Sequence, residues 1–314
     1  MIQVSHLFKN YGKFAAVNDV SFSVGEKITG LLGPNGAGKT TVMKILTGYH
    51  YPSAGTAQVA GISVTENPVA CKKLIGYLPE SVPLYGELTV DEYLTFIAES
   101  RLIPKNERKS KIDSAIERCG LGLKRKARIE TLSKGYKQRT GLAQSILHDP
   151  PVLILDEPTT GLDPNQIIEI RSLIKELGSS KTVILSTHIL QEVEAMCEQV
   201  LILNEGRIAA QGTPDSIARS MRGGETWTIL VKGGSAGNIR ENLERFAIAH
   251  SFKTENLEVT GTGEDRAELN FFLEGGTEDS GELLFDWAVE YNYKLLSMRQ
   301  KKLSLEDIFV RLTA

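Results

Sequence analysis

The sequence lacks several features that mark particular protein classes. Its three cysteines, Cys71, Cys119 and Cys197, are odd in number and never spaced as C-x-x-C, which argues against a disulfide framework or a cysteine metal site. Apolar runs such as PVLIL are far shorter than the roughly 20 residues that a membrane-spanning helix needs. The opening stretch MIQVSHLFKNYG has no long apolar core, so we expect no secretory signal. Together these absences predict a reduced, cytoplasmic protein that does not cross a bilayer by itself.

The charge balance is equally plain. A net charge of −3 provides no general attraction to nucleic acid, so we expect no nucleic-acid partner. The basic segments 101–111 and 123–128 are typical of solvated helix faces, with a contact surface for a partner as the alternative. A length of 314 residues is enough for two domains.

Residues 1–220 alternate between short strands rich in Val, Ile and Leu and helical stretches. This alternation is typical of an α/β domain with a parallel sheet covered on both faces. Between residues 89 and 147 the pattern becomes helical, with an apolar stripe at Val90, Tyr93, Leu94 and Ile97. The sequence therefore predicts an α/β domain with a helical segment within it.

Residues 221–314 have a different organisation. They read as strand, helix, two strands, helix and strand, the βαββαβ order of a small, ferredoxin-like α+β domain. Trp227, Phe271, Phe272 and Trp287 are expected in its core. A last helix begins with Ser304 and Asp307 spaced as a capping box and carries Leu305, Ile308, Phe309 and Leu312 on one face. We expect this domain to regulate the first one or to stabilise a dimer.

A phosphate-binding loop follows the strand that precedes residue 33. The segment GPNGAGKTT fits the pattern G-x-x-x-x-G-K-[ST] in full and lies between a strand and a helix. Its glycines let backbone N–H groups converge on phosphate oxygens, while Lys39 adds a positive charge and Thr40 a hydroxyl for Mg²⁺. The segment predicts a nucleoside triphosphate site formed by Gly33, Pro34, Asn35, Gly36, Ala37, Gly38, Lys39, Thr40 and Thr41.

An acidic pair ends the apolar strand VLIL. Asp156 suits a Mg²⁺ ligand, and Glu157 can orient or deprotonate the attacking water. The alternative is a helix N-cap, which does not explain two acids followed by Pro158. His188 follows another strand, and Tyr11 lies near the first one. Taken alone, both are more typical of structural positions.

The segment TLSKGYKQR starts a second helix with a serine and a glycine, Ser133 and Gly135. Two anion sites in one domain require either two anions or two subunits.

With GPNGAGKTT, LSKGYKQR, LILDEPTTGLDP and STH in this order, residues 1 to about 220 resemble an ABC-type ATPase, the nucleotide-binding subunit of a transporter. The resemblance implies a P-loop fold with a RecA-like core, an antiparallel β subdomain and a helical subdomain, which binds ATP and Mg²⁺. It also implies a head-to-tail dimer, of this chain or with a homologous ATPase, in which Ser133 and Gly135 contact the ATP held by the partner's phosphate loop. The two anion sites are then halves of shared sites.

The resemblance also assigns roles to single residues. Tyr11 would stack on adenine, Glu157 would be the general base, and Asp156 the Mg²⁺ partner. Asp163 would lie at the dimer seam, and His188 would hold the γ-phosphate. Glu80 occupies the usual glutamine position, near Mg²⁺ and the membrane subunit.

Two positions depart from the family pattern. Glu80 brings a carboxylate where a neutral amide is usual, and the signature L-S-G-G-Q reads LSKGY, with Lys134 and Tyr136 substituted. Together with SLEDIFVRLT at the end, these departures are similar to ATPase subunits of ABC-2-type exporters with separate membrane chains, including multidrug-export and gliding-motility-associated ones. The resemblance thus implies a protein at the inner face of the cell membrane, bound to a permease.

Other classes explain the residues less completely. A translation factor of the ABC type usually has two nucleotide domains, whereas one phosphate loop is present here. A repair clamp would insert long coiled coils between Lys39 and Asp156, where no sustained heptad pattern occurs. A kinase would leave the signature segment unexplained. The transported substrate cannot be predicted from this chain.

Overall fold

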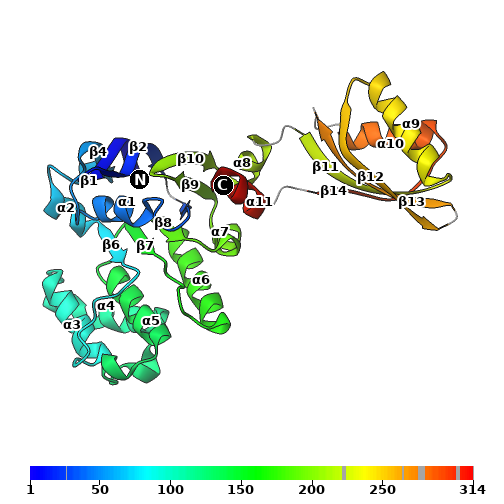
Figure 1. Cartoon of the computed structure of the whole chain (residues 1–314). Helices are drawn as coiled ribbons and strands as arrows, with labels where there is room; N and C mark the ends of the chain where they lie inside the picture. The colour runs from blue at the N-terminus through cyan, green and yellow to red at the C-terminus, as the bar shows by residue number, and fades with distance from the viewer. Residues whose placement is uncertain (26, 221–223, 264, 275–279, 302–304, 314) are drawn as a thin grey trace. The chain divides into compact units, whose positions relative to one another are not determined.

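The computed structural model describes residues 1–25, 27–220, 224–263, 265–274, 280–301 and 305–313 (Figure 1). The chain divides into two compact units. The first consists of Met1–Pro214 with Phe309–Ala314, and the second is Asp215–Ile308.

The first unit begins with an antiparallel sheet of four strands. They are β1 (Ile2–Tyr11), β2 (Phe14–Val24), β4 (Ala54–Val59) and β5 (Ile62–Ser63), in the order β2-β1-β4-β5. Ile2 and Val4, two positions apart in β1, are buried, as expected for a sheet with one face against a core, and Leu7 is buried beyond a shift in register.

A second sheet of six strands forms the centre of this unit. Its strands are β3 (Ile28–Leu32), β6 (Ile75–Leu78), β7 (Val152–Asp156), β8 (Thr182–Thr187), β9 (Gln199–Asn204) and β10 (Arg207–Gly212), in the order β10-β9-β3-β8-β7-β6. Neighbours from β9 to β6 pair in parallel, and β10 is an antiparallel edge. Every residue of β3, β7 and β8 is buried, which explains their continuous apolar runs. The predicted parallel sheet is confirmed.

Helices connect these strands. They are α1 (Lys39–Leu46), α2 (Pro68–Lys73), α6 (Pro164–Gly178) and α7 (Leu190–Met196). Helix α8 (Pro214–Ser220) follows β10 and, from Asp215 on, belongs to the second unit. Val42, Met43, Ile45 and Leu46 of α1 share one core cluster with residues from both sheets. The helix that follows the glycine loop is therefore fixed by packing along most of its length.

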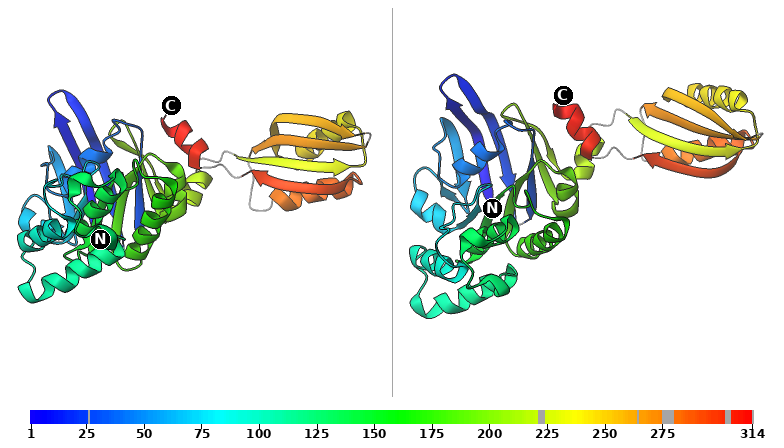
Figure 2. Two further views of the ribbon diagram at one scale, coloured as in Figure 1. Left: turned by 90° about the horizontal axis from the view of Figure 1, so that it is seen from below. Right: turned by 60° about the horizontal axis from the view of Figure 1, so that its bottom comes forward.

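The helical segment consists of α3 (Val90–Ser100), α4 (Lys105–Arg118), two 3-10 turns (η1, Gly122–Lys124, and η2, Ile129–Thr131) and α5 (Lys134–Ile146). Figures 1 and 2 show the α-helices gathered in one group next to β6. The capping box of α3 is complete, since Thr89 Oγ1 accepts from the Glu92 backbone while the Glu92 carboxylate accepts from the Thr89 backbone. Val90, Tyr93 and Leu94 are buried as the apolar stripe predicts.

The second unit contains β11 (Gly224–Lys232), α9 (Ala236–Ala249), β12 (Lys253–Gly263), β13 (Arg266–Glu274), α10 (Ser280–Glu290) and β14 (Lys294–Lys301). All neighbouring strands are antiparallel in the order β12-β13-β11-β14, which is the ferredoxin-like arrangement. Both helices pack on one face of the sheet (Figure 1).

The expected core residues of this unit need one correction. Trp227, Phe271 and Trp287 are buried in its core, but Phe272 is only half-buried and is not part of the cluster. Successive residues of a strand point to opposite faces, so Phe271 and Phe272 cannot both face the helices.

The last helix, α11 (Leu305–Thr313), crosses the division between the units. Asn204 Nδ2 of β9 donates to the Leu312 carbonyl at 3.0 Å, which ties the end of α11 to the first unit. Of the predicted apolar face, Ile308 is buried, whereas Phe309 and Leu312 are half-buried. Ser304, the predicted cap, lies outside the described residues. The boundary expected between residues 220 and 221 thus differs from the observed division, which falls after Pro214 and returns residues 309–314 to the first unit.

Candidate nucleotide-binding site

The glycine loop connects the fully buried strand β3 to α1, and its backbone requires glycine at defined positions. Gly36 and Gly38 have φ values of +83° and +105°, in the region that side chains disfavour. A Cβ atom at Gly38 would lie 2.5 Å from the Ala16 carbonyl oxygen, and one at Gly33 would lie 2.5 Å from that of Leu203. Strands β2 and β9 therefore hold the loop so tightly that only glycine fits at these two residues.

Lys39, the first residue of α1, is buried within the loop. Its ammonium donates to the carbonyl oxygens of Gly33 at 2.7 Å and Pro34 at 3.2 Å. Burial lowers the pKa of this ammonium, and three nearby carboxylates oppose that shift. The carboxylates are those of Glu157, Asp156 and Glu80. The Lys39 ammonium thus lies near three carboxylates.

Asp156 ends β7 and is almost completely buried. One carboxylate oxygen accepts from Ser186 Oγ at 2.5 Å, and the Thr40 hydroxyl lies near this side chain. Burial raises the pKa of the Asp156 carboxyl, and the charge of Glu80 adds to the rise, while the hydroxyl groups of Ser186 and Thr40 oppose it. The fold therefore places the acid at the end of β7 near the hydroxyl that follows Lys39.

Glu157 is held from several sides. Its backbone has φ +50°, unusual for a residue with a side chain, and its N–H donates to Ser186 Oγ at 3.1 Å. Thr160 Oγ1 donates to its carboxylate at 3.1 Å, and His188 Nδ1 lies 3.0 Å from each carboxylate oxygen. That bond requires the proton on Nδ1, which leaves Nε2 of the half-exposed ring free to accept when the histidine is neutral. The strained, left-handed backbone of Glu157 is of a kind that is common at functional sites.

These groups meet in a pocket of about 370 Å³. Most of the predicted site residues line it, namely Tyr11, Asn35, Gly36, Ala37, Gly38, Lys39, Thr40, Thr41, Glu80, Glu157 and His188. Phe14, Ala16 and Thr160 also line the pocket and were not predicted. The sequence could have indicated Phe14, since KNYGKF places a second aromatic residue three positions after Tyr11. In the structure the Phe14 side chain is 62% exposed.

The signature segment lies elsewhere. Ser133 is the N-cap of α5 and accepts from the Tyr136 backbone at 3.5 Å, a long bond. A Cβ at Gly135 would overlap the Gln166 side chain, and one at Gly161 would overlap that of Lys134. Neither Ser133 nor Gly135 is among the described residues that line the 370 Å³ pocket. Within one subunit, the two predicted anion sites are therefore separate.

The two signature substitutions have local partners. The Tyr136 ring lies 5.6 Å from the ammonium of Lys124 and 5.9 Å from the guanidinium carbon of Arg139. Such cation–π contacts favour an aromatic ring at this position. Lys134 extends toward Gly161, in the loop that precedes α6.

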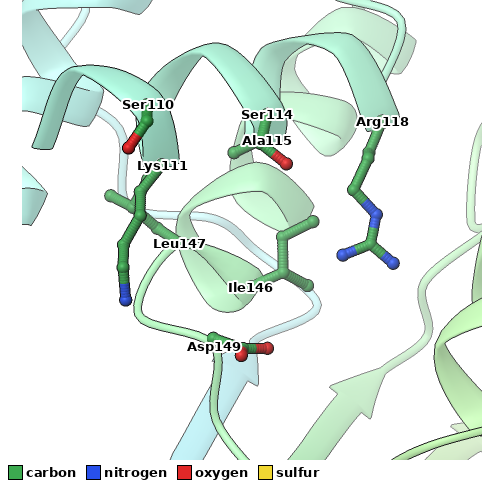
Figure 3. Close-up of a pocket in the computed structure, with 8 residues that line it drawn as sticks. All are labelled: Ser110, Lys111, Ser114, Ala115, Arg118, Ile146, Leu147 and Asp149. Carbon is green, nitrogen blue, oxygen red and sulfur yellow. The ribbon is translucent and has the colours of Figure 1, made fainter. Parts of the chain in front are cut away.

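Other pockets lie outside this site. One of about 500 Å³ is lined in part by five aromatic residues, Tyr49, Tyr77, Tyr85, Tyr93 and Phe96. Pro79 and Ser81, the neighbours of Glu80, also line it. Another, of about 290 Å³, lies between α4 and the end of α5, where Lys111 and Arg118 extend toward Asp149 (Figure 3). In the latter, Asp149 pairs with Lys181 and Arg118 with Glu176, so its main charges are already balanced.

Similarity to known proteins agrees with this geometry. The family model described as "ABC transporter" matches residues 17–160. The uncharacterized ABC transporter ATP-binding protein YxlF of Bacillus subtilis is 33% identical over 312 residues, which cover 99% of each chain. This chain belongs to the ABC transporter ATP-binding proteins.

Other ABC proteins extend the comparison. Nod factor export ATP-binding protein I of Rhizobium etli is 34% identical over 99% of this chain and 93% of its own length. A solved structure of the ATP-binding subunit of an ABC transporter is 32% identical, with a TM-score of 0.66 over 70% of this chain and 92% of its own. The dimeric cassette MJ0796, at 23% identity and a TM-score of 0.62, shares the fold.

The protein is therefore an ATP-binding and ATP-hydrolysing subunit of an ABC transporter. The P-loop fold expected from its motifs is confirmed. None of the helices in the described ranges has the length and apolar character that a bilayer crossing requires.

Proposed function

We propose that this ABC ATPase works as a head-to-tail dimer in which each subunit completes the other's ATP site. The observation that carries the proposal is the separation of two anion-binding elements. The 370 Å³ pocket contains the phosphate loop, Glu157 and His188, whereas Ser133 and Gly135 lie outside it. A second subunit, approaching with its own Ser133 and Gly135, would supply what one pocket lacks.

Within the pocket, each predicted residue has a physical role. Tyr11 is 44% exposed at the mouth and offers a ring on which adenine can stack. The loop N–H groups and Lys39 bind the phosphates. Glu157 is the general base, since its carboxylate is buried, oriented by Thr160 and His188, and placed near the Lys39 charge. His188 presents its second ring nitrogen to the γ-phosphate, and Asp163, the N-cap of α6, lies at the dimer seam.

Mg²⁺ fits the oxygen donors at the end of β7. Thr40 supplies a hydroxyl and Asp156 a carboxylate, and Glu80 adds a second carboxylate whose charge acts on Asp156. These three residues would hold the ion, directly or through water. When bound, Mg²⁺ neutralises charge on the ATP phosphates. A nearby cation also favours the ionised form of Asp156, which burial alone disfavours.

The membrane partner is a separate permease, and the aromatic pocket of about 500 Å³ is its contact site. Tyr49, Tyr85 and Phe96 are exposed around this pocket, and aromatic residues are enriched in protein interfaces. Its wall includes both neighbours of Glu80, which itself faces the ATP pocket. Movement at this contact can thus reach the nucleotide. The protein would then lie at the cytoplasmic face of the membrane.

Export is the proposed direction of transport. Relatives that align with nearly the whole chain include proteins named for Nod factor export and linearmycin resistance, the latter 30% identical over 100% of this chain. Their names, with the LSKGY signature and Glu80, support placement among ABC-2-type exporters. We infer that the second unit regulates the ATPase or stabilises its dimer.

The test is sedimentation of Glu157→Gln protein with and without ATP and Mg²⁺, together with ATPase rates. We expect hydrolysis to fall by about 100-fold or more, because the base is lost, and a dimer to form only with ATP. Lys39→Met, which removes the phosphate-binding charge, is the control that should stay monomeric. Retained hydrolysis in Glu157→Gln would refute the role of the base, and an ATP-independent assembly state would refute the shared site.

A further inference from the structure

Glu192, in α7, is a completely buried carboxylate outside the ATP pocket. It is 0% exposed. Oε1 accepts from Thr159 Oγ1 at 2.5 Å, and Oε2 accepts from Thr187 Oγ1 at 2.9 Å. Arg171 of α6 lies farther away, with Nη2 3.5 Å from Oε1. Burying a carboxylate is costly unless it is bonded on both oxygens, and here each oxygen has a hydroxyl donor.

The two threonines belong to the segments that carry the proposed catalytic groups. Thr159 is two residues after Glu157, in the loop that follows β7. Thr187 is the last residue of β8, directly before His188. One carboxylate therefore connects the ends of two neighbouring parallel strands at the point where each delivers a functional side chain.

The hydrogen bonds of Thr187 fix the backbone on both sides of His188. Thr187 Oγ1 donates to Glu192 and also accepts from the Ile189 backbone N–H at 3.1 Å. The residues before and after His188 are thus fixed through the same hydroxyl. On the other strand, Thr160, the neighbour of Thr159, donates to the Glu157 carboxylate. The contact between His188 Nδ1 and Glu157 lies between these two anchored segments.

Arg171 contributes less to this geometry than the hydroxyls do. Its Nε is buried and has no hydrogen-bond partner among the described residues, so the guanidinium approaches Glu192 through one group only. At 3.5 Å this contact is longer than either hydroxyl bond. Arg171 balances the charge, while the threonines set the position.

We propose that Glu192 is a positioning residue for ATP hydrolysis. Through Thr159 and Thr187 it holds Glu157 and His188 at the separation that lets them bond, without touching ATP itself. The inference rests on the roles proposed above for Glu157 and His188. It predicts that loosening this anchor slows the chemical step and leaves ATP binding nearly unchanged.

The test uses matched substitutions at the two threonines. Thr187→Val and Thr159→Val keep the side-chain shape but remove the hydroxyl, whereas Thr187→Ser and Thr159→Ser keep the hydroxyl. We expect each Val variant to lower kcat by about 10- to 100-fold, the range for small misplacement of catalytic groups, with KM for ATP within about two-fold. Each Ser variant should recover most of the rate. Glu192→Gln, which retains one acceptor, should give the same kcat loss.

Glu194→Gln is the control, because Glu194 lies in the same helix but is exposed. It should leave kcat unchanged. Val variants as fast as their Ser counterparts, or a change in KM with constant kcat, would overturn the proposal. Glu157→Gln is measured in parallel: if it loses hydrolysis while both Val variants keep theirs, only the role of Glu192 is refuted. If Glu157→Gln itself retains hydrolysis, the proposed function fails.

Discussion

The half-buried histidine after α5, His148, makes the stability of the first unit depend on pH. His148 Nε2 lies 3.1 Å from the Ile75 carbonyl oxygen, and Nδ1 is buried with no partner among the described residues. Burial lowers the pKa of this imidazole to about 4, the charge of Arg101 acts in the same direction, and the bond to Ile75 opposes the shift. Protonation below neutral pH would therefore place a charge where the fold does not solvate it.

The size of the effect follows from the two pKa values, 6.5 for the ordinary side chain and about 4 in the folded chain. Between these values the unfolded chain binds more protons than the folded one, so stability is present above pH 6.5 and is lost as the pH falls toward 4. From pH 7 to pH 5 the full shift corresponds to about 1.8 kcal/mol. Because part of the ring remains accessible to solvent, which screens the charge, we expect ~1 kcal/mol.

Urea unfolding of wild type and His148→Gln at pH 7 and pH 5 measures this loss. Glutamine can still donate to Ile75 but does not titrate, and all other groups are common to both proteins. Wild type should lose about 1 kcal/mol more than the variant between the two pH values. Both tryptophans, Trp227 and Trp287, lie in the second unit, so their fluorescence provides an internal control that the substitution should not change, while circular dichroism follows the whole chain. Equal losses in both proteins would refute the reasoning.

Two further substitutions test the nucleotide pocket. Asp156→Asn should raise the melting temperature of the protein in the absence of nucleotide at pH 8. Burial raises the pKa of Asp156, so its ionised form costs stability at every pH above 3.8. An unchanged or lower melting temperature would contradict this. Gly38→Ala should abolish binding of a fluorescent ATP analogue, since a left-handed φ costs about 1–3 kcal/mol and its Cβ would overlap the Ala16 carbonyl. Gly36→Ala, which has a left-handed φ but nothing within 4 Å of its Cβ, should lose less, and equal losses would show that the overlap is unimportant.

Local signals in the sequence were sufficient for the architecture. Continuous apolar runs predicted β7 and β8 because parallel strands are buried on both faces. The glycine loop was predictable because its residues, strand and helix are contiguous. The meeting of Glu157 and His188 in one pocket was expected only from the family resemblance, since it depends on two strands pairing across about thirty residues of sequence.

Tertiary packing decided what the sequence left open. The segment LQEVEAM contains two glutamates, and only the orientation of α7 buries Glu192 and exposes Glu194. Phe272 was misplaced because two adjacent aromatics give no sign of which one faces the helices. The return of residues 309–314 to the first unit depends on a bond from Asn204, more than one hundred residues earlier, which no local pattern encodes.

That return makes the second unit an insertion in the first one rather than an appendage. Ending the chain near residue 221 would remove residues 309–313 of the ATPase unit together with the whole second unit. An internal excision avoids this loss. Thr226 of β11 and Lys301 of β14 are register partners in adjacent strands of the second unit, so these two residues lie about 5 Å apart. A few residues of flexible linker could therefore replace residues 227–300 and leave the ATPase unit covalently continuous through α11.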